Sequence, residues 1–364
     1  MQNHLAKISI LFVFLPAITG CSNSGGPFSP GTVGGAGAET PREVPIPVDE
    51  NSHSGAVFHD VDRDGVFRTN DHPLAGVQVT AGREIFTTDR QGLFRFPRDE
   101  EAGYVYISKP SGYDPLLDHN SIPMFFRKIE DGQKVYTFPL VPTPQKGTFS
   151  AVLMNDSHLE VIPGEGGHRP DQDPEESFNE FVDEFLSLDP PPDFLVANGD
   201  QSGVSPGNTA GLEAYVQACS RLEVPVYNVM GNPGHNDGDL DRVFFKDAYR
   251  SVFGPLYYAF DVAGWHLIVL DTNLISGEHG RELAFGLDER QLAWFREDLD
   301  LNRDKRMLLF HHEPIDNTEN ALDVLIKLLD GRKPDVWVDK EEILGLIRSY
   351  PVLATFVGHT HTNG

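Results

Sequence analysis

Residues 149–158 read FSAVLMNDSH, an apolar run that ends in Asp156 and His158. An uninterrupted apolar run of this length is typical of a buried strand, and open α/β sheets place their ligands beyond the carboxyl ends of such strands. A carboxylate and an imidazole are both common metal ligands. We interpret the stretch as a strand that carries two ligands to a sheet edge, although the pair taken alone also fits an ordinary turn.

Further apolar runs along the chain end in the same kind of residue. They lead into NGD at 198–200, GN at 231–232, HHEP at 311–314 and GHTH at 358–361. Apolar residues recur at helical spacing between these runs, which predicts an α/β fold with alternating strands and helices. Because neighbouring strand ends meet at one sheet edge, we expect oxygen and imidazole ligands to converge there.

The order D-x-H, G-D, G-N, H-x-P and G-H-x-H resembles the calcineurin-like metallophosphoesterases over roughly residues 146–364. The stretches 253–260 and 265–271 resemble a further block of the bacterial members. The resemblance implies a four-layer α/β/β/α sandwich that hydrolyses phosphomonoesters or phosphodiesters. It also implies a hydroxide that bridges two metal ions of the manganese, iron, zinc or magnesium type.

The family pattern assigns a metal-binding role to particular side chains of this chain. Asp156, His158 and His361 would bind one metal, Asn232, His312 and His359 would bind the other, and Asp200 would bridge the two. The H-x-P spacing selects His312 rather than His311. A carboxylate is needed at the bridge because it alone among these ligands can neutralise two cations.

The stretch after Asn232 departs from the family pattern. The family places a histidine there, to which protonation of the leaving group is attributed, whereas this chain has Pro233, which has no side-chain proton to donate. Gly234 permits a tight turn that would bring His235 to the same place, so His235 is the candidate general acid. The alternative is a solvated loop in a catalytically impaired, metal-binding interaction module at the cell surface.

The length and net charge of the chain bear on its number of domains and on its binding partners. A chain of 364 residues is too long for one ordinary core and predicts two domains. Its 29 basic and 55 acidic residues give a net charge of -26. Binding to nucleic acid requires a basic surface, so we expect no nucleic-acid partner.

The N-terminal segment has the pattern of an export signal. Residues 1–20 carry Lys7 as their only charge and an apolar core at 8–15, which is too short to span a bilayer. The sequence ITGC at 18–21 resembles a bacterial lipobox and implies lipidation of Cys21, with an ordinary signal peptide as the alternative. Residues 21–52 are rich in Gly, Ser and Pro and predict a flexible tether. We therefore expect a protein of the bacterial cell envelope, in the outer membrane, periplasm or cell surface, held to the membrane by lipid only.

Residues 53–145 alternate apolar and polar positions between Gly, Pro and Asp, which predicts a small antiparallel β-sandwich. The stretches TDRQGLF at 88–94 and ISKPSGY at 107–113 resemble the prealbumin-like domain that precedes some bacterial calcineurin-like phosphoesterases. This region therefore supports the same family independently of the ligand motifs.

The first of these β-strands leads into an acidic loop. Asp60, Asp62 and Asp64 alternate before Gly65, as at the start of an EF-hand loop, and Asp71 falls at the closing position. A true EF-hand has a bidentate Glu at that position and flanking helices, whereas strands are expected here. A structural calcium loop and a plain acidic turn both remain open.

Two further features of the sequence concern the stability of the fold. Cys219 lies in an amphipathic run and is expected to fill core, so no disulfide is predicted. The chain ends at Gly364, soon after the last expected ligands, whereas family members continue with further strands and a helix. We therefore expect the second sheet to lack its C-terminal part.

Overall fold

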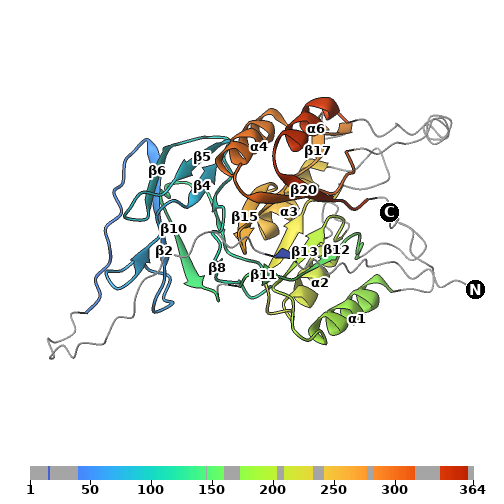
Figure 1. Ribbon diagram of the computed structural model, residues 1–364, viewed down its shortest axis with the longest axis horizontal. Helices are drawn as coiled ribbons and strands as arrows, with labels where there is room; N and C mark the ends of the chain where they lie inside the picture. The colour runs from blue at the N-terminus through green and yellow to red at the C-terminus, as the bar shows by residue number, and fades with distance from the viewer. Residues whose placement is uncertain are drawn as a thin grey trace, which may run out of the picture.

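The computed structural model describes residues 15–16, 40–144, 146–159, 173–202, 209–232, 242–276, 282–315 and 337–359. A β-rich region lies beside a larger α/β region (Figure 1). This arrangement confirms the predicted fold class, a mixed α/β fold preceded by an all-β sandwich.

The β-rich region consists of two facing sheets. The first has the order β3-β2-β10-β8 with β6 also paired to β2, and the second has the order β5-β4-β7-β9. The bounds are β2 (Ser52–His59), β3 (His72–Pro73), β4 (Gln78–Ala81), β5 (Glu84–Thr87), β6 (Leu93–Pro97), β7 (Tyr104–Ile107), β8 (Tyr113–Pro115), β9 (Phe126–Lys128) and β10 (Val135–Pro142). Aromatic side chains such as Phe94, Phe96 and Phe138 are buried between the sheets, so their apolar faces form the core.

One strand pair differs from the predicted antiparallel sandwich. β10 pairs with β2 in parallel, with Val135 opposite Ser54 and Leu140 opposite His59. A parallel pair requires a long connection between its strands, and here that connection contains all the other strands of the region. The prediction of an entirely antiparallel sheet was therefore wrong, because strand direction depends on this long-range pairing.

The first sheet of the α/β region is parallel and has the order β12-β13-β14. Its elements are β11 (Thr148–Phe149), β12 (Ala151–Met154), α1 (Pro174–Leu186), β13 (Phe194–Asn198), α2 (Ala210–Cys219), β14 (Val226–Val229) and α3 (Arg242–Phe253). Asp173 caps α1 by accepting from the backbone N–H groups of Glu175 and Glu176. The buried face of α1 carries Phe178 and Phe181, which belong to the same hydrophobic cluster as Val196 of the sheet.

The second sheet is mixed and has the order β15-β16-β19-β20. Its elements are β15 (Tyr258–Val262), β16 (Trp265–Val269), β17 (Asn273–Ser276), β18 (Glu282–Phe285), α4 (Glu289–Leu301), β19 (Arg306–Phe310), α6 (Lys340–Ser349) and β20 (Val352–Phe356). β17 and β18 form a separate hairpin. Tyr227 of the first sheet stacks on Phe260 of the second with ring centroids 3.7 Å apart, so the sheets face each other across an aromatic core.

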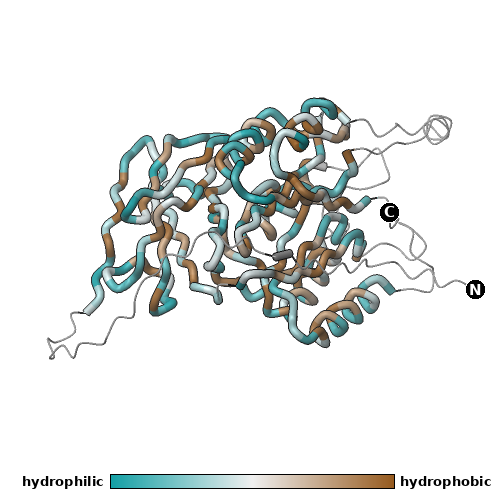
Figure 2. The backbone as a smooth tube through the Cα atoms, viewed as in Figure 1, coloured by the Kyte–Doolittle hydropathy of each residue, from teal (hydrophilic) through white to brown (hydrophobic). Residues whose placement is uncertain are grey.

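Helices cover the outer faces of both sheets. In Figure 1, α1 and α2 lie on one side of the paired sheets and α4 and α6 lie on the other. Figure 2 shows the hydrophobic segments gathered between these helix layers and the hydrophilic ones outside. The layers α/β/β/α therefore follow the amphipathic pattern of the chain.

The β-rich region packs directly against the α/β region. Phe125 contacts Tyr258 with ring centroids 4.7 Å apart, and the Trp294 indole N–H donates to the Thr80 hydroxyl at 3.3 Å. The Tyr257 hydroxyl donates to the carbonyl of Gly82 at 3.1 Å. Apolar and polar contacts together hold the two regions in one arrangement.

Three further features bear on the sequence predictions. β1 (Leu15–Pro16) lies inside the predicted signal peptide and pairs antiparallel with β11. Cys219 is buried, and this burial raises the pKa of its thiol to about 12, in keeping with a packing role. None of the helices in the described ranges combines the length and apolar character needed to cross a bilayer.

Candidate metal centre

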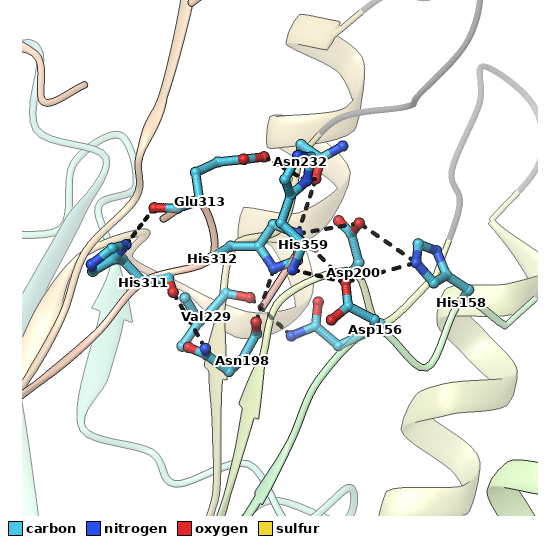
Figure 3. A network of polar contacts seen from close by, with 12 residues as sticks. Asp156, His158, Asn198, Asp200, Val229, Asn232, His311, His312, Glu313 and His359 are labelled. Carbon is cyan, nitrogen blue, oxygen red and sulfur yellow. Dashed lines mark hydrogen bonds and ion pairs between the residues drawn. The ribbon is translucent and has the colours of Figure 1, made fainter. Parts of the chain in front are cut away.

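Five strands deliver the predicted ligands to one edge of the paired sheets. Residues beyond the ends of β12, β13, β14, β19 and β20 meet there, and these are Asp156, His158, Asp200, Asn232, His312 and His359. Figure 3 shows the side chains of Asp156, His158 and Asp200 turned toward one another, with His312 and His359 facing them. The predicted ligands that the structure describes therefore come together, although they are far apart in sequence.

Asp200 lies between two groups of donor atoms. Its Oδ2 is 3.7 Å from Nε2 of His158 on one side and 3.2 Å from Nε2 of His312 on the other. Asp156 Oδ1 lies 3.9 Å from His158 Nε2. The Asp156, His158 and Asp200 donor atoms form one group, within 4.8 Å of one another. A carboxylate placed between two donor groups has the position that a bridging ligand requires.

The second group gathers around the amide oxygen of Asn232. This Oδ1 lies 2.9 Å from His312 Nε2 and 3.0 Å from His359 Nδ1. The ligand atoms of His312, Glu313 and His359 also lie within 4.8 Å of one another. Oxygen and imidazole donors at these separations suit divalent or trivalent ions of the first transition row and magnesium, so the residues fit the predicted metals.

The structure places His312, and not His311, in the centre. The Nδ1 of His312 donates to the backbone carbonyl of Asn198 at 2.9 Å, which directs Nε2 toward Asp200 and Asn232. His311 instead turns toward Trp337, with Nδ1 2.7 Å from the Glu313 carbonyl. Burial lowers the pKa of His311 to about 4, so its ring is neutral at ordinary pH.

The carboxylates of the centre stabilise positive charge on the His312 ring. Burial by itself would lower the pKa of His312, but Asp200, Asp156 and Glu313 together raise it to about 10. Asp200 is only 5% exposed and Glu313 only 1%. Carboxylates this deeply buried require a compensating cation or proton, which is a second indication that the site fits metal ions.

The backbone is strained where it presents the ligands. Positive φ angles occur at Asp156 (54°), His158 (45°), Asp200 (51°) and His359 (66°). A residue other than glycine in this region costs about 1–2 kcal/mol, and such strain gathers at functional sites. The strand tips turn sharply here, which directs the ligand side chains inward.

The glycines of the motifs are required by close packing. A Cβ at Gly231 would overlap Asp200, a Cβ at Gly199 would overlap the His312 ring, and Gly358 lies against both His312 and Asp156. Gly199 also has a φ of 96°, which other residues rarely adopt. The G-D, G-N and G-H pairs therefore leave the space that the ligands occupy.

The comparisons with known proteins agree with this geometry. The model of the family "Calcineurin-like phosphoesterase" matches residues 149–363, and the model of "N terminal of Calcineurin-like phosphoesterase" matches residues 61–143. The chain belongs to the calcineurin-like phosphoesterase family. The match to the N-terminal model confirms that the β-rich region is a companion domain of this family.

Two curated relatives match part of the chain. A probable glycerophosphodiester phosphodiesterase GpdQ from Arcobacter nitrofigilis is 27% identical over 177 residues, which are 48% of this chain and 59% of that protein. A probable cyclic nucleotide phosphodiesterase from Rhodococcus erythropolis is 29% identical over 175 residues, which are 47% of this chain and 52% of that protein. The chain thus spans somewhat more than half the length of these relatives.

A solved structure of a purple acid phosphatase, PPD1 from seeds of yellow lupin (Lupinus luteus), is also similar. The matched region is 78% of this chain and 53% of the phosphatase chain, with 10% sequence identity and a TM-score of 0.37.

Three predicted functional residues lie outside the residues that the structure describes. These are the remaining metal ligand His361, the candidate acid His235 and the lipidation site Cys21. Their assignments remain predictions.

The structure also reveals residues around the centre that the motifs did not predict. Glu313 occupies the variable position of H-x-P, and its Oε1 lies 3.1 Å from His359 Nδ1. Asn273 donates from Nδ2 to the carbonyl of Gly231 at 3.1 Å and to Asp271 Oδ1 at 3.0 Å, which supports the backbone just before Asn232. The block at 265–271 marked the preceding strand, but its spacing alone did not indicate this contact.

The acidic loop of the β-rich domain brings together part of the predicted calcium site. The carboxylates of Asp60, Asp62 and Asp71 have oxygens within 4.8 Å of one another. Asp64 does not join them, since it pairs with Arg68 at 2.8 Å. Both oxygens of Asp60 and both of Asp71 accept backbone N–H groups of the loop. This network accounts for a plain acidic turn, and the calcium loop remains a prediction.

Proposed function

We propose that the chain hydrolyses phosphoester bonds with two metal ions, and that phosphodiesters are its substrates. The observation that carries the proposal is the position of Asp200 between the two donor groups. Family membership supports a hydrolase, and the printed names of both curated relatives describe phosphodiesterases. The reaction would take place outside the cytoplasm, with the protein anchored in the cell envelope through lipid on Cys21.

The metal ions would be held by the predicted ligands, with Asp156, His158 and His361 at one position and Asn232, His312 and His359 at the other. When bound, such a pair supplies a hydroxide for in-line attack and neutralises the phosphoryl oxygens. The side chains themselves fix the arrangement. Asp200 would link the two metal positions, and the Asn198 carbonyl accepts from His312 Nδ1 and so orients the ring.

The proposed general acid is His235, which would donate a proton to the departing oxygen. General acids typically contribute a factor of about 100 to 10,000, and they matter most when an alkoxide must leave. Nitrophenolate leaves with little help. The variant His235→Ala should therefore slow alkyl phosphoester hydrolysis far more than nitrophenyl phosphoester hydrolysis, at unchanged metal content. Equal slowing of both reactions would mean that His235 does not protonate the leaving group.

The variant Asp200→Asn tests the metal-dependent reaction itself. An amide cannot bridge two cations as a carboxylate does, so we expect loss of turnover together with one equivalent of bound metal. Asp183→Asn, a change of an exposed acid on α1, is the matched control. Elemental analysis and turnover of bis-nitrophenyl phosphate with added manganese provide the readouts. Normal turnover with two bound metals in Asp200→Asn would refute the assignment.

The departure from the family sequence after Asn232, where Pro233 stands in place of histidine, favours a second candidate function. A metal-binding interaction module would bind metal but hydrolyse neither diesters nor monoesters. Two bound metals without turnover of any phosphoester by the wild-type chain would favour this alternative.

A further inference from the structure

We propose that Glu313 is an additional carboxylate ligand of the metal position formed by Asn232, His312 and His359, and that it adapts the centre to phosphodiesters. The inference rests on the proposed two-metal function and names a ligand outside the motif pattern. It also predicts that the net charge of the metal centre favours phosphodiesters over phosphomonoesters.

The first argument is the spacing of the donor atoms. Glu313 Oε1 lies 3.1 Å from His359 Nδ1, and His359 Nδ1 lies 3.0 Å from Asn232 Oδ1. Asn232 Oδ1 lies 2.9 Å from His312 Nε2, which lies 3.2 Å from Asp200 Oδ2. Neighbouring ligands in an octahedral shell with bonds of about 2.1 Å are about 3.0 Å apart. Glu313 therefore continues a series of contacts with the separations of one coordination shell.

The second argument is that the backbone holds Glu313 in place. Its carbonyl lies 2.7 Å from Nδ1 of His311, and its N–H donates to the Thr272 hydroxyl at 3.4 Å. Pro314 follows directly, which restricts the preceding residue to an extended backbone. His311, which is not in the ligand cluster, thus acts as a positioning residue. Figure 3 shows the Glu313 carboxylate pointing toward Asn232 and His359 while its carbonyl faces His311.

The third argument is burial and charge. Glu313 is 1% exposed, so its carboxylate is largely removed from water, where the attraction between opposite charges is strong. A cation shared with Asn232, His312 and His359 would therefore be strongly stabilised by this carboxylate. In contrast to histidine and asparagine, a carboxylate is a hard anionic donor, which favours magnesium or manganese over zinc at this position.

The additional carboxylate has a consequence for substrate choice. Two divalent ions with Asp156 and Asp200 alone would leave a net charge of roughly +2, and Glu313 reduces it to roughly +1. A phosphomonoester at neutral pH carries about 1.5 to 2 negative charges, whereas a diester carries about one. The less positive centre disfavours the dianion more strongly, so Glu313 favours the diester.

The test compares Glu313→Gln with the wild-type chain and with Glu341→Gln, which changes an exposed acid on α6. Calorimetric titration of metal-free protein with manganese should show two sites in the wild type and in the control. In Glu313→Gln we expect one site to be retained and the other to bind at least about 10-fold more weakly. At saturating manganese, the ratio of monoester to diester kcat/KM should rise in this variant.

The outcomes separate this inference from the proposed function. If the wild-type chain binds no manganese and hydrolyses no phosphoester, the proposed function fails. If the wild-type chain binds two ions and is active while Glu313→Gln binds both with unchanged affinity, the ligand role of Glu313 is refuted. If the variant does not fold, a crystal structure of the manganese-loaded wild type decides the question. An Oε atom of Glu313 within about 2.3 Å of manganese supports the inference, and one beyond bonding distance, only accepting from His359, overturns it.

Discussion

Raising the pH from 6.5 to above 9 should destabilise the folded chain by roughly 3 kcal/mol through one histidine, His266 on β16. This side chain is 0% exposed. Its Nδ1 lies 2.7 Å from Asp261 Oδ1, and its Nε2 lies 2.8 Å from Asp298 Oδ2. Because both ring nitrogens face carboxylates, the ring is held in its protonated form. Lys305 also contacts Asp261, with Nζ 2.6 Å from Oδ2.

The size and sign of the effect follow from the pKa of His266. Burial by itself would lower this pKa, but Asp298 and Asp261 raise it from 6.5 to about 9. Each pH unit between the unfolded and folded values corresponds to about 1.4 kcal/mol, which gives roughly 3 kcal/mol. Because the folded-state pKa is the higher one, the contribution is fully present below pH 6.5. It is lost as the pH rises through about 9.

Urea unfolding at closely spaced pH values between 6 and 10 measures this contribution, and the difference between the wild type and a His266 variant separates it from the titration of other groups. The free energy of unfolding should fall over this range in the wild type. The variant His266→Gln should be less stable at pH 6.5 and should lose most of the pH dependence, because an amide does not titrate. A wild-type stability that stays constant from pH 6.5 to 9.5, or an equal slope in the variant, would show that His266 is not held protonated.

The other predictions concern the glycine before Asn232, the predicted lipidation site Cys21 and the acidic loop that contains Asp62 and Asp64. Gly231→Ala should weaken binding of one metal by about 10-fold or more in a manganese titration, because its Cβ would overlap Asp200. Gly345→Ala in α6, where a Cβ meets nothing within 4 Å, should leave metal binding unchanged and stability equal or about 0.5–1 kcal/mol higher. Labelled fatty acid should be incorporated by the wild-type chain in a bacterial host but not by Cys21→Ser, and equal labelling would reject the lipobox interpretation. Millimolar calcium should raise the Tm of the full chain if the acidic loop binds it, and a shift that persists after Asp62→Ala with Asp64→Ala would favour the plain turn.

Much of the candidate centre could be predicted from short motifs. Asp156, Asp200 and Asn232 each follow an apolar run, and parallel strands bring their carboxyl ends to one sheet edge. The H-x-P spacing likewise selected His312, which the structure places against Asp200. These features are encoded locally, since a strand, its end and the following turn depend on residues adjacent in the chain.

Tertiary structure alone decided the contacts between distant segments. The sequence did not indicate that Glu313 reaches His359, that Asn273 supports Gly231, or that β2 and β10 run in parallel. It also left His266 as an ordinary strand residue, although two carboxylates from other elements hold it charged. Apolar periodicity specifies which face of an element is buried, but not which polar group meets another across the core. That choice is made when the layers pack, because only then do buried charges find the partners that compensate them.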